Sequence, residues 1–186
     1  MLTVEALRGI LGLTPHPVEG GYFAETYRSA DRIPAAALPS HYGGAHAAST
    51  AIYYLLTPDT FSAMHRLTSD EIFHFYLGDP VEMLQLHPDG SHEIVVIGPN
   101  LEAGQRPQVV VPRHIWQGAR LIPGGRYALL GTTVAPGFDY ADYETAPPPH
   151  PPGHPSHREI PDPRPHPLAP RRRRKSGNKE PNQRRN

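Results

Sequence analysis

The chain has 186 residues with 18 basic and 18 acidic side chains, 24 prolines and no cysteine, and its formal net charge is zero. The charges are unevenly distributed, since residues 1–144 sum to about −7 and residues 145–186 to about +7. The absence of cysteine excludes a disulfide scaffold, a thiolate nucleophile and a cysteine-based metal site. Residues 145–186 hold too few apolar side chains to offset their conformational entropy. We therefore predict one acidic folded domain, residues 1–144, and a basic, Pro-rich, disordered tail, residues 145–186.

Apolar runs in the chain are short. The longest, such as residues 51–56 and 109–111, fall far below the roughly 18 residues of a membrane-spanning helix. Residues 1–13 carry charged side chains within their apolar pattern and lack the basic start of a signal peptide. We therefore expect a cytoplasmic protein that makes no membrane contact.

The first predicted element is a short helix after Thr3. Leu7, Ile10 and Leu11 follow one another at helical spacing, and Thr3 is a suitable N-cap. Gly12 is a typical residue at a helix end, and Pro15 follows it. One N-terminal helix is therefore expected.

Beyond residue 15 the pattern changes to short runs rich in β-branched and aromatic residues, separated by Gly, Pro, Asn and Asp at intervals of eight to twelve residues. The predicted strands are residues 22–28, 50–56, 60–65, 71–77, 81–86, 93–97, 108–111, 117–122 and 127–134. Many short strands at even spacing are typical of a β-sandwich or a small β-barrel. The fold class is thus predicted to be all-β.

The first candidate site lies where two predicted strands meet. His65 ends one strand and Glu71 opens the next, so both can point into one barrel interior and share a divalent metal. Strand alternation puts Glu71 and Phe73 on one face and His74 on the other, unless a bulge shifts the register. The alternative is that His65 and Glu71 form a buried hydrogen-bonded pair or cap a turn.

A second candidate segment begins at Pro112, which interrupts a strand that resumes at Ile115. Gln117 then faces the interior or the mouth of a barrel, where its amide can hydrogen-bond a ligand or lend an oxygen to a metal. Trp116 is the single tryptophan, and we interpret it as a large hydrophobic side chain of the core or of an interface.

Together these motifs resemble the cupin superfamily, and more specifically its DUF985 (Cupin_5) family. The resemblance rests on four strings, which are residues 16–28 (HPVEGGYFAETYR), 49–56 (STAIYYLL), 69–76 (SDEIFHFY) and 111–117 (VPRHIWQ). It covers residues 13–143 and leaves the tail outside. It implies a double-stranded β-helix, that is, a jelly-roll-like barrel, which commonly pairs into a homodimer.

The resemblance also implies a metal site that this chain fills incompletely. Metal-binding cupins use a His-x-His unit, a glutamate and a further histidine, and here His65 and Glu71 match. Leu67 and Gln117 stand at the other two histidine positions. The remaining expectation is a weak site for Fe, Mn, Ni or Zn, held by His65 and Glu71 and completed by Gln117, His74 and water. The histidine at position 114 replaces a common glycine, so a positive φ there would cause strain.

Glu25 lies among aromatic residues of the predicted strand 22–28. It is either a hydrogen-bond acceptor or general base at the ligand mouth, or a surface ion pair with Arg28 or with Arg126 of a later strand. Of Tyr53 and Tyr54, one should line the barrel and the other should pack outside.

We thus predict a cupin that binds a small polar molecule, sugar-like or keto-acid. The predicted pocket is lined by Glu25, Tyr53, His65, Glu71, Phe73, His74 and Gln117. If it is an enzyme, the expected reaction is that of an isomerase or epimerase, by analogy with sugar-nucleotide epimerases of the same barrel. Glu71 or Glu25 would then be the base, and His65 the acid or a metal ligand.

Two alternative hypotheses about function remain. The same pocket can belong to a non-catalytic binding or sensor module. The basic run at residues 171–175 can bind nucleic acid or another polyanion without sequence preference.

Overall fold

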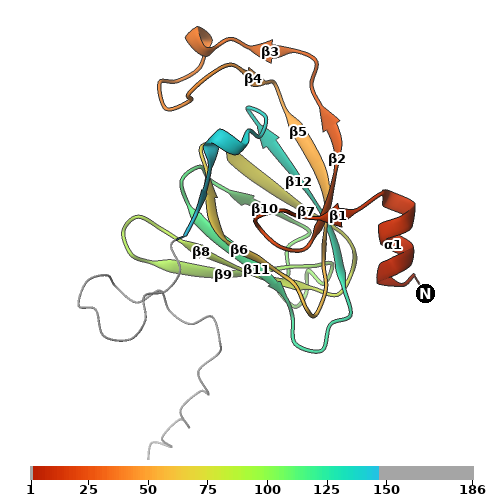
Figure 1. The fold of residues 1–186 in the computed structure, drawn as a ribbon. Helices are drawn as coiled ribbons and strands as arrows, with labels where there is room; N and C mark the ends of the chain where they lie inside the picture. Colours follow the sequence, from red (N-terminus) through yellow and green to blue (C-terminus); the bar gives the residue numbers. More distant parts are fainter. Residues whose placement is uncertain (1, 147–186) are drawn as a thin grey trace, which may run out of the picture.

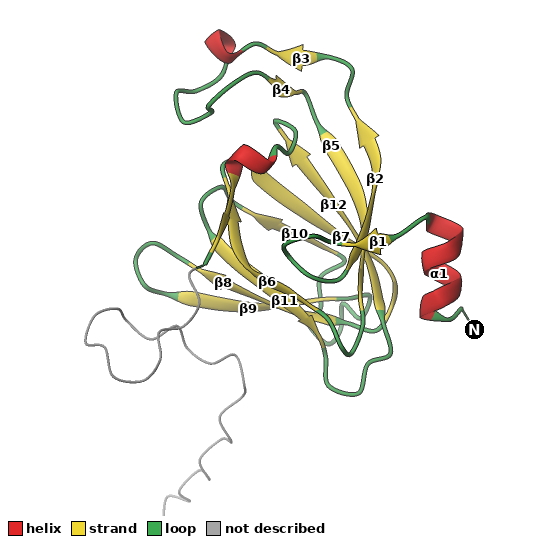
Figure 2. Ribbon diagram, viewed as in Figure 1, coloured by secondary structure: helices red, strands yellow, loops and turns green. Residues whose placement is uncertain are grey.

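The computed structural model describes residues 2–146, so the predicted disordered tail lies outside the described residues except for its first two positions. Two antiparallel sheets face each other and enclose the interior (Figures 1 and 2). This arrangement confirms the all-β, jelly-roll-like double-stranded β-helix with one short N-terminal α-helix. Within residues 2–146, no helix is long and apolar enough to span a bilayer.

The first sheet has six strands. In spatial order they are β1 (Thr14–Pro15), β2 (Tyr22–Arg28), β5 (Thr50–Leu56), β12 (Ala128–Ala135), β7 (Asp70–Gly78) and β10 (Gln108–Val111). The second sheet has five strands, which are β13 (Tyr143–Thr145), β6 (Phe61–Leu67), β11 (Trp116–Leu121), β8 (Val81–Leu86) and β9 (His92–Ile97). The nine predicted strands are all present, with ends that differ from the predicted ones by at most two residues.

Four short strands were not predicted, namely β1, β3 (Arg32–Ile33), β4 (His46–Ala47) and β13. Strands of two or three residues are too short to show a hydrophobic period. β3 and β4 pair with each other and form a hairpin that projects beyond the barrel (Figure 1). Two 3-10 turns, Ala35–Ala37 and Tyr140–Asp142, complete the described elements.

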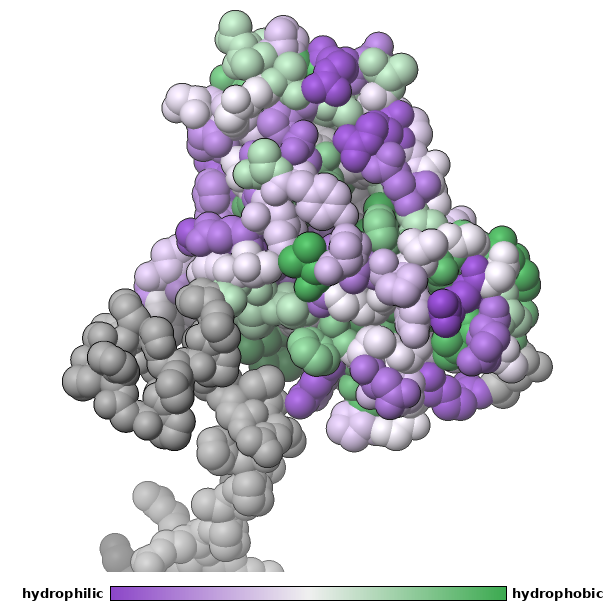
Figure 3. Space-filling view, viewed as in Figure 1, coloured by the Kyte–Doolittle hydropathy of each residue, from purple (hydrophilic) through white to green (hydrophobic). Residues whose placement is uncertain are grey.

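Helix α1 (Val4–Leu11) begins and ends where its capping residues predict. The Thr3 hydroxyl accepts a hydrogen bond from the Ala6 N–H, and Gly12 adopts a left-handed φ of 64°. Leu7 is buried, but Ile10 is 70% exposed and does not contribute to the core. Apolar surface is accordingly visible on the side of the molecule where α1 lies (Figure 3).

The apolar core is divided between the two sides of the first sheet. One cluster fills the space between the sheets and includes Tyr54, Phe73, Met83 and Leu130. A second cluster, with Leu7 among its members, packs α1 against the outer face of the first sheet. The barrel interior also holds buried polar side chains, and these form the candidate site.

Candidate functional site

A cavity of about 80 Å³ opens between the two sheets, and most of the ionisable side chains of the barrel interior face it. Strands of both sheets, the loop before β2 and the segment around the Tyr140–Asp142 turn all contribute to its wall. The described lining residues are His16, Glu19, Phe23, Glu25, Arg28, Thr50, Ala51, Ile52, His65, Leu67, Glu71, Thr132, Val134, Phe138, Tyr140 and Tyr143.

His65 is the central polar group of this cavity and is 2% exposed. Its Nδ1 lies 2.8 Å from the carbonyl oxygen of Ala63, which can only accept, so Nδ1 carries a hydrogen. Nε2 faces Glu71 Oε2 at 3.8 Å and Glu19 Oε2 at 4.0 Å. Burial alone would lower the pKa of His65, but the two carboxylates outweigh burial and raise this pKa to about 9. The exchangeable proton of His65 therefore resides on Nε2, between two carboxylates.

Glu71 approaches the cavity from β7 and is tied to the other sheet through Gln117 of β11. Gln117 Nε2 donates a hydrogen bond of 2.6 Å to Glu71 Oε2, and Gln117 is 1% exposed. The β6–β11 register sets Gln117 opposite His65. The expected meeting of His65, Glu71 and Gln117 in the barrel interior is therefore found in the structure, with Gln117 positioned as a hydrogen-bond donor behind Glu71.

Glu19 is a second buried carboxylate of the cavity, and it is not among the predicted site residues. The hydroxyl of Ser62 donates to its Oε1, and its backbone oxygen accepts from the Ala63 N–H at 2.8 Å. Gly20 makes this approach feasible, because its φ is 97° and any Cβ there would collide with the backbone oxygen of Phe61. Burial raises the pKa of Glu19, with the charge of His65 acting in the opposite direction.

His16 contacts Glu19 and also lines the cavity. Its Nδ1 accepts a hydrogen bond of 2.8 Å from the Glu19 N–H, so the hydrogen of the neutral ring is on Nε2. Nε2 lies 4.0 Å from Glu19 Oε2. Burial, helped by the nearby His65, lowers the pKa of His16. His16 is thus a neutral donor in the wall.

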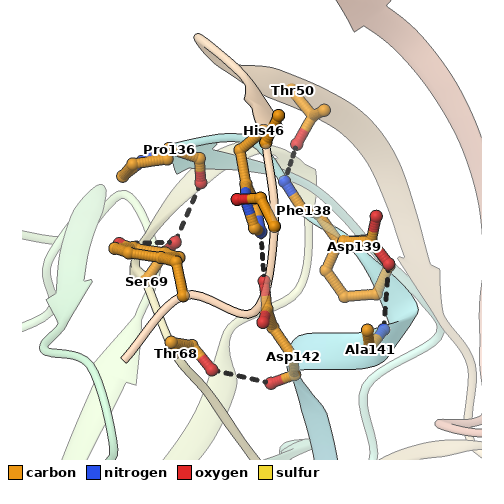
Figure 4. A network of polar contacts seen from close by, with 12 residues as sticks. His46, Thr50, Thr68, Ser69, Pro136, Phe138, Asp139, Ala141 and Asp142 are labelled. Atoms are coloured by element: carbon orange, nitrogen blue, oxygen red, sulfur yellow. Dashed lines mark hydrogen bonds and ion pairs between the residues drawn. The ribbon is translucent and has the colours of Figure 1, made fainter. Parts of the chain in front are cut away.

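The segment that contains Phe138, Tyr140 and Tyr143 forms one side of the cavity. The projecting hairpin contacts this segment through His46 and Asp142 (Figure 4). His46 of β4 lies 2.5 Å from Asp142 Oδ2 through Nε2, and its Nδ1 donates to the oxygen of Gly44. We call residues 138–143 the cap segment and the His46–Asp142 pair the latch.

Further bonds fix the cap segment to the barrel (Figure 4). The Phe138 N–H donates to Thr50 Oγ1 at 2.9 Å, and Thr68 Oγ1 donates to the backbone oxygen of Asp142. Tyr143 then stacks on His65, with ring centroids 5.0 Å apart and 18° between the planes. The latch and these bonds therefore set the position of Tyr143 over His65.

A metal site of the usual cupin type does not fit the residues present. Leu67 offers no donor atom, and the Gln117 amide directs its N–H to Glu71, while Gln117 Oε1 is buried without a partner among the described residues. Within residues 2–146, no group of three or more His, Asp or Glu side chains is arranged to hold a metal ion.

The other predicted site residues are divided among three places. Glu25 lines the cavity at its rim, where it makes two hydrogen bonds to Arg28. Phe73 is buried in the core between the sheets. His74 lies on the outer face of β7, where Nε2 bonds Thr133 Oγ1 at 3.2 Å and the ring stacks on Tyr76.

Tyr53 packs with the outer cluster, and its neighbour Tyr54 points inward and donates a hydrogen bond of 2.9 Å to the oxygen of Gly20. Strand alternation thus directs Tyr53 and His74 away from the cavity. Glu19, His16 and Tyr143 were missed because they lie in a loop and in a three-residue strand, where no alternation assigns a face.

A larger cavity of about 560 Å³ lies outside the barrel. It is formed over the outer face of the second sheet, with Phe61, Met64, Leu84, Ile94 and the Pro123–Gly125 turn in its wall. Its volume exceeds that of the interior cavity, but acid–base groups are concentrated in the interior. Volume alone therefore does not identify the site where chemistry would occur.

Comparison with known proteins agrees with the fold. The chain is 31% identical over 134 residues to the uncharacterized protein YML079W of Saccharomyces cerevisiae, a match that covers 67% of this chain and 66%, slightly under two thirds, of the yeast protein. A hypothetical protein from Leishmania major has 34% identity and a TM-score of 0.70 over 77% of this chain and 86% of its own.

Protein SO0799 from Shewanella oneidensis has 33% identity and a TM-score of 0.68 over 78% of this chain and 85% of its own. The family model described as "Cupin superfamily (DUF985)" matches residues 6–146. The chain therefore belongs to the DUF985 family of the cupin superfamily.

Proposed function

We propose that the interior cavity binds a small polar molecule and exchanges protons with it, as an isomerase or epimerase does. The observation that carries the proposal is the placement of His65 Nε2 in the cavity wall, 3.8 Å from the carboxylate of Glu71. A carboxylate and an imidazolium side by side supply the base and the acid that proton transfer next to a carbonyl group requires.

The steps follow from the positions of these two groups. Glu71 takes a proton from a hydroxyl-bearing carbon next to the ligand's carbonyl group, and His65 Nε2 gives its proton to the carbonyl oxygen, which leaves an enediol. In an isomerisation, Glu71 returns its proton to the former carbonyl carbon while the now neutral His65 Nε2 takes the hydroxyl proton of the first carbon, whose oxygen becomes the new carbonyl oxygen. In an epimerisation, a solvent proton adds to the opposite face of the first carbon, His65 Nε2 takes back the proton it gave, and Glu71 loses its proton to solvent. No electron is gained or lost overall. The buried bond from Gln117 holds Glu71 in place for this role.

Glu71 suits the role of the base better than Glu25, the other predicted candidate. Both carboxylate oxygens of Glu25 are engaged by Arg28, and its side chain is 41% exposed at the rim. Glu71, in contrast, is buried in the cavity wall beside His65, where a bound ligand can contact both side chains.

The test is proton exchange with solvent. Small sugars and keto acids are incubated with the protein in deuterated water, and loss of the proton next to the carbonyl is followed by nuclear magnetic resonance. We expect exchange with the unchanged protein, and a loss of at least 100-fold in Glu71→Gln and in His65→Gln. His74→Gln is the matched control, because His74 faces away from the cavity, and it should exchange at the original rate.

Two outcomes would redirect the proposal. Exchange that survives in both Glu71→Gln and His65→Gln would remove these residues from the mechanism. Ligand binding that needs His65 and Glu71 without any exchange would indicate the non-catalytic binding or sensor module. The hydrogen bond from Gln117 to Glu71 is compatible with that second role, since it also orients the Glu71 carboxylate to accept a hydrogen bond from a ligand.

A further inference from the structure

Tyr143 carries an unsatisfied polar group in the wall of the cavity. Its hydroxyl oxygen is buried and has no hydrogen-bond partner among the described residues, although its ring is held in place by stacking on His65. A buried hydroxyl without a partner costs free energy, so such groups in folded proteins are normally paired with water or a ligand. The hydroxyl of Tyr143 is therefore available to a molecule in the cavity.

The charges around the cavity restrict what that molecule can be. Three carboxylates line the wall, those of Glu19, Glu25 and Glu71, against two cations, His65 and Arg28. The Arg28 guanidinium already donates to both oxygens of Glu25 and to the backbone oxygen of Phe138. An anionic ligand would thus meet a wall with no net positive charge and with its arginine already engaged.

The volume gives a second restriction. A cavity of about 80 Å³ is well below the roughly 300–1,000 Å³ of sites for drug-sized ligands. The molecule that fits inside has few non-hydrogen atoms, whatever part of it extends past the rim.

We propose that Tyr143 is a ligand-contacting residue whose hydroxyl donates a hydrogen bond to a carbonyl or hydroxyl oxygen, and that the site selects small neutral hydroxycarbonyl compounds over keto or hydroxy acids. This inference rests on the function proposed above for the cavity. The inference favours the sugar-like class of ligand over the keto-acid class, between which the Glu71–His65 pair alone does not discriminate.

The experiment compares dihydroxyacetone with pyruvate and lactate, which have the same number of non-hydrogen atoms but carry a carboxylate. Dissociation constants are measured by chemical-shift titration of the full chain. We expect dihydroxyacetone to bind on the order of tenfold or more tightly than either acid. Tyr143→Phe should raise the dissociation constant of dihydroxyacetone by about tenfold. Tyr76→Phe, a tyrosine on the outer face of β7 that is 50% exposed, is the matched control and should bind as the unchanged protein does.

Thermal unfolding of the ligand-free variants separates a ligand contact from a structural role. Tyr143→Phe keeps the ring and removes an unpaired buried hydroxyl, so its melting temperature should stay the same or rise. A fall in melting temperature with unchanged affinity would make Tyr143 a structural residue and overturn the inference.

Other results also overturn it. If pyruvate or lactate binds as tightly as dihydroxyacetone, or if dihydroxyacetone does not bind, the neutral class is wrong. If substitution of His65 and of Glu71 weakens the binding of any of these ligands but Tyr143→Phe does not, the function proposed for the cavity is retained and the proposed role of Tyr143 is wrong. Binding that is insensitive to all three residues would place the ligand elsewhere and contradict both proposals.

Discussion

His114 adopts a φ of 65°, which confirms that the corner after Pro112 requires a left-handed residue. The His114 N–H donates a hydrogen bond of 2.8 Å to the oxygen of Leu67, so the strained residue also fixes the end of β6. A β-branched side chain has the largest steric strain in this left-handed conformation, and glycine has none.

We predict that His114→Val lowers the free energy of unfolding by about 1–2 kcal/mol, whereas His114→Gly changes it by less than about 1 kcal/mol. Urea unfolding of both variants measures the difference. Equal losses in the two variants would show that the side chain of His114, and not its backbone conformation, matters for stability.

At this scale the sequence predicted which residue types would cluster but not all the members of the cluster. His65, Glu71 and Gln117 lie at strand positions whose alternation assigns a face, and they meet inside the barrel as expected. Glu19 reaches the same interior through a loop conformation that depends on Gly20, and no periodicity describes such a loop.

At the level of elements, the projecting hairpin and the cap segment act together through the latch. Burial disfavours the charged form of His46, but its hydrogen bonds to Asp142 and Gly44 and the charges of Asp142 and Asp139 outweigh burial and raise the pKa of His46. A raised folded-state pKa means that the stabilisation is fully present below about pH 6.5, the ordinary value for histidine, and is lost as the pH rises through the folded-state value.

We therefore expect the cap segment to loosen on the alkaline side of neutrality. Hydrogen exchange of the backbone amides of residues 138–143 should accelerate as the pH rises above about 6.5, beyond the intrinsic effect of pH on exchange. Asp142→Asn should exchange faster at low pH, with a weaker extra dependence on pH. Glu144→Gln, which alters the exposed pair with Arg66 of the adjacent strand, serves as the control. An unchanged pH response in Asp142→Asn would exclude the latch as its cause.

The elements themselves were largely predictable. Strands of four residues or more are runs rich in apolar, β-branched and aromatic residues between Gly, Pro, Asn and Asp, and all of them were found. The hairpin β3–β4 and the strand β13 are held by side-chain and backbone bonds to distant residues, such as His46 to Asp142, and such pairing is not a local property of the sequence.

For the whole molecule, the resemblance to cupins implies a homodimer, which remains a prediction. The outer face of the second sheet is a suitable surface, since the 560 Å³ cavity lies over it and Phe61 and Ile94 are 62% and 54% exposed. Exposed large apolar side chains that share one hollow are a feature of protein interaction surfaces.

We predict that Phe61→Glu converts a dimer into a monomer in sedimentation velocity experiments, because it places two charges in an apolar interface. Val110→Glu is a control of matched chemistry, since Val110 is 51% exposed on β10 of the other sheet. A dimer that persists in Phe61→Glu and dissociates in Val110→Glu would assign the interface to the first sheet.

Strand β6 is covered along its outer edge by two unrelated parts of the chain. The backbone of Glu19 bonds Ala63, and β13 pairs with the remainder, from His65 to Leu67, with a last bond from the Ala146 N–H to the oxygen of Met64. A chain shortened to end before Tyr143 would leave half of this edge with open backbone donors and acceptors. Such an edge is a template for strands of other molecules, so β13 also protects the barrel against aggregation.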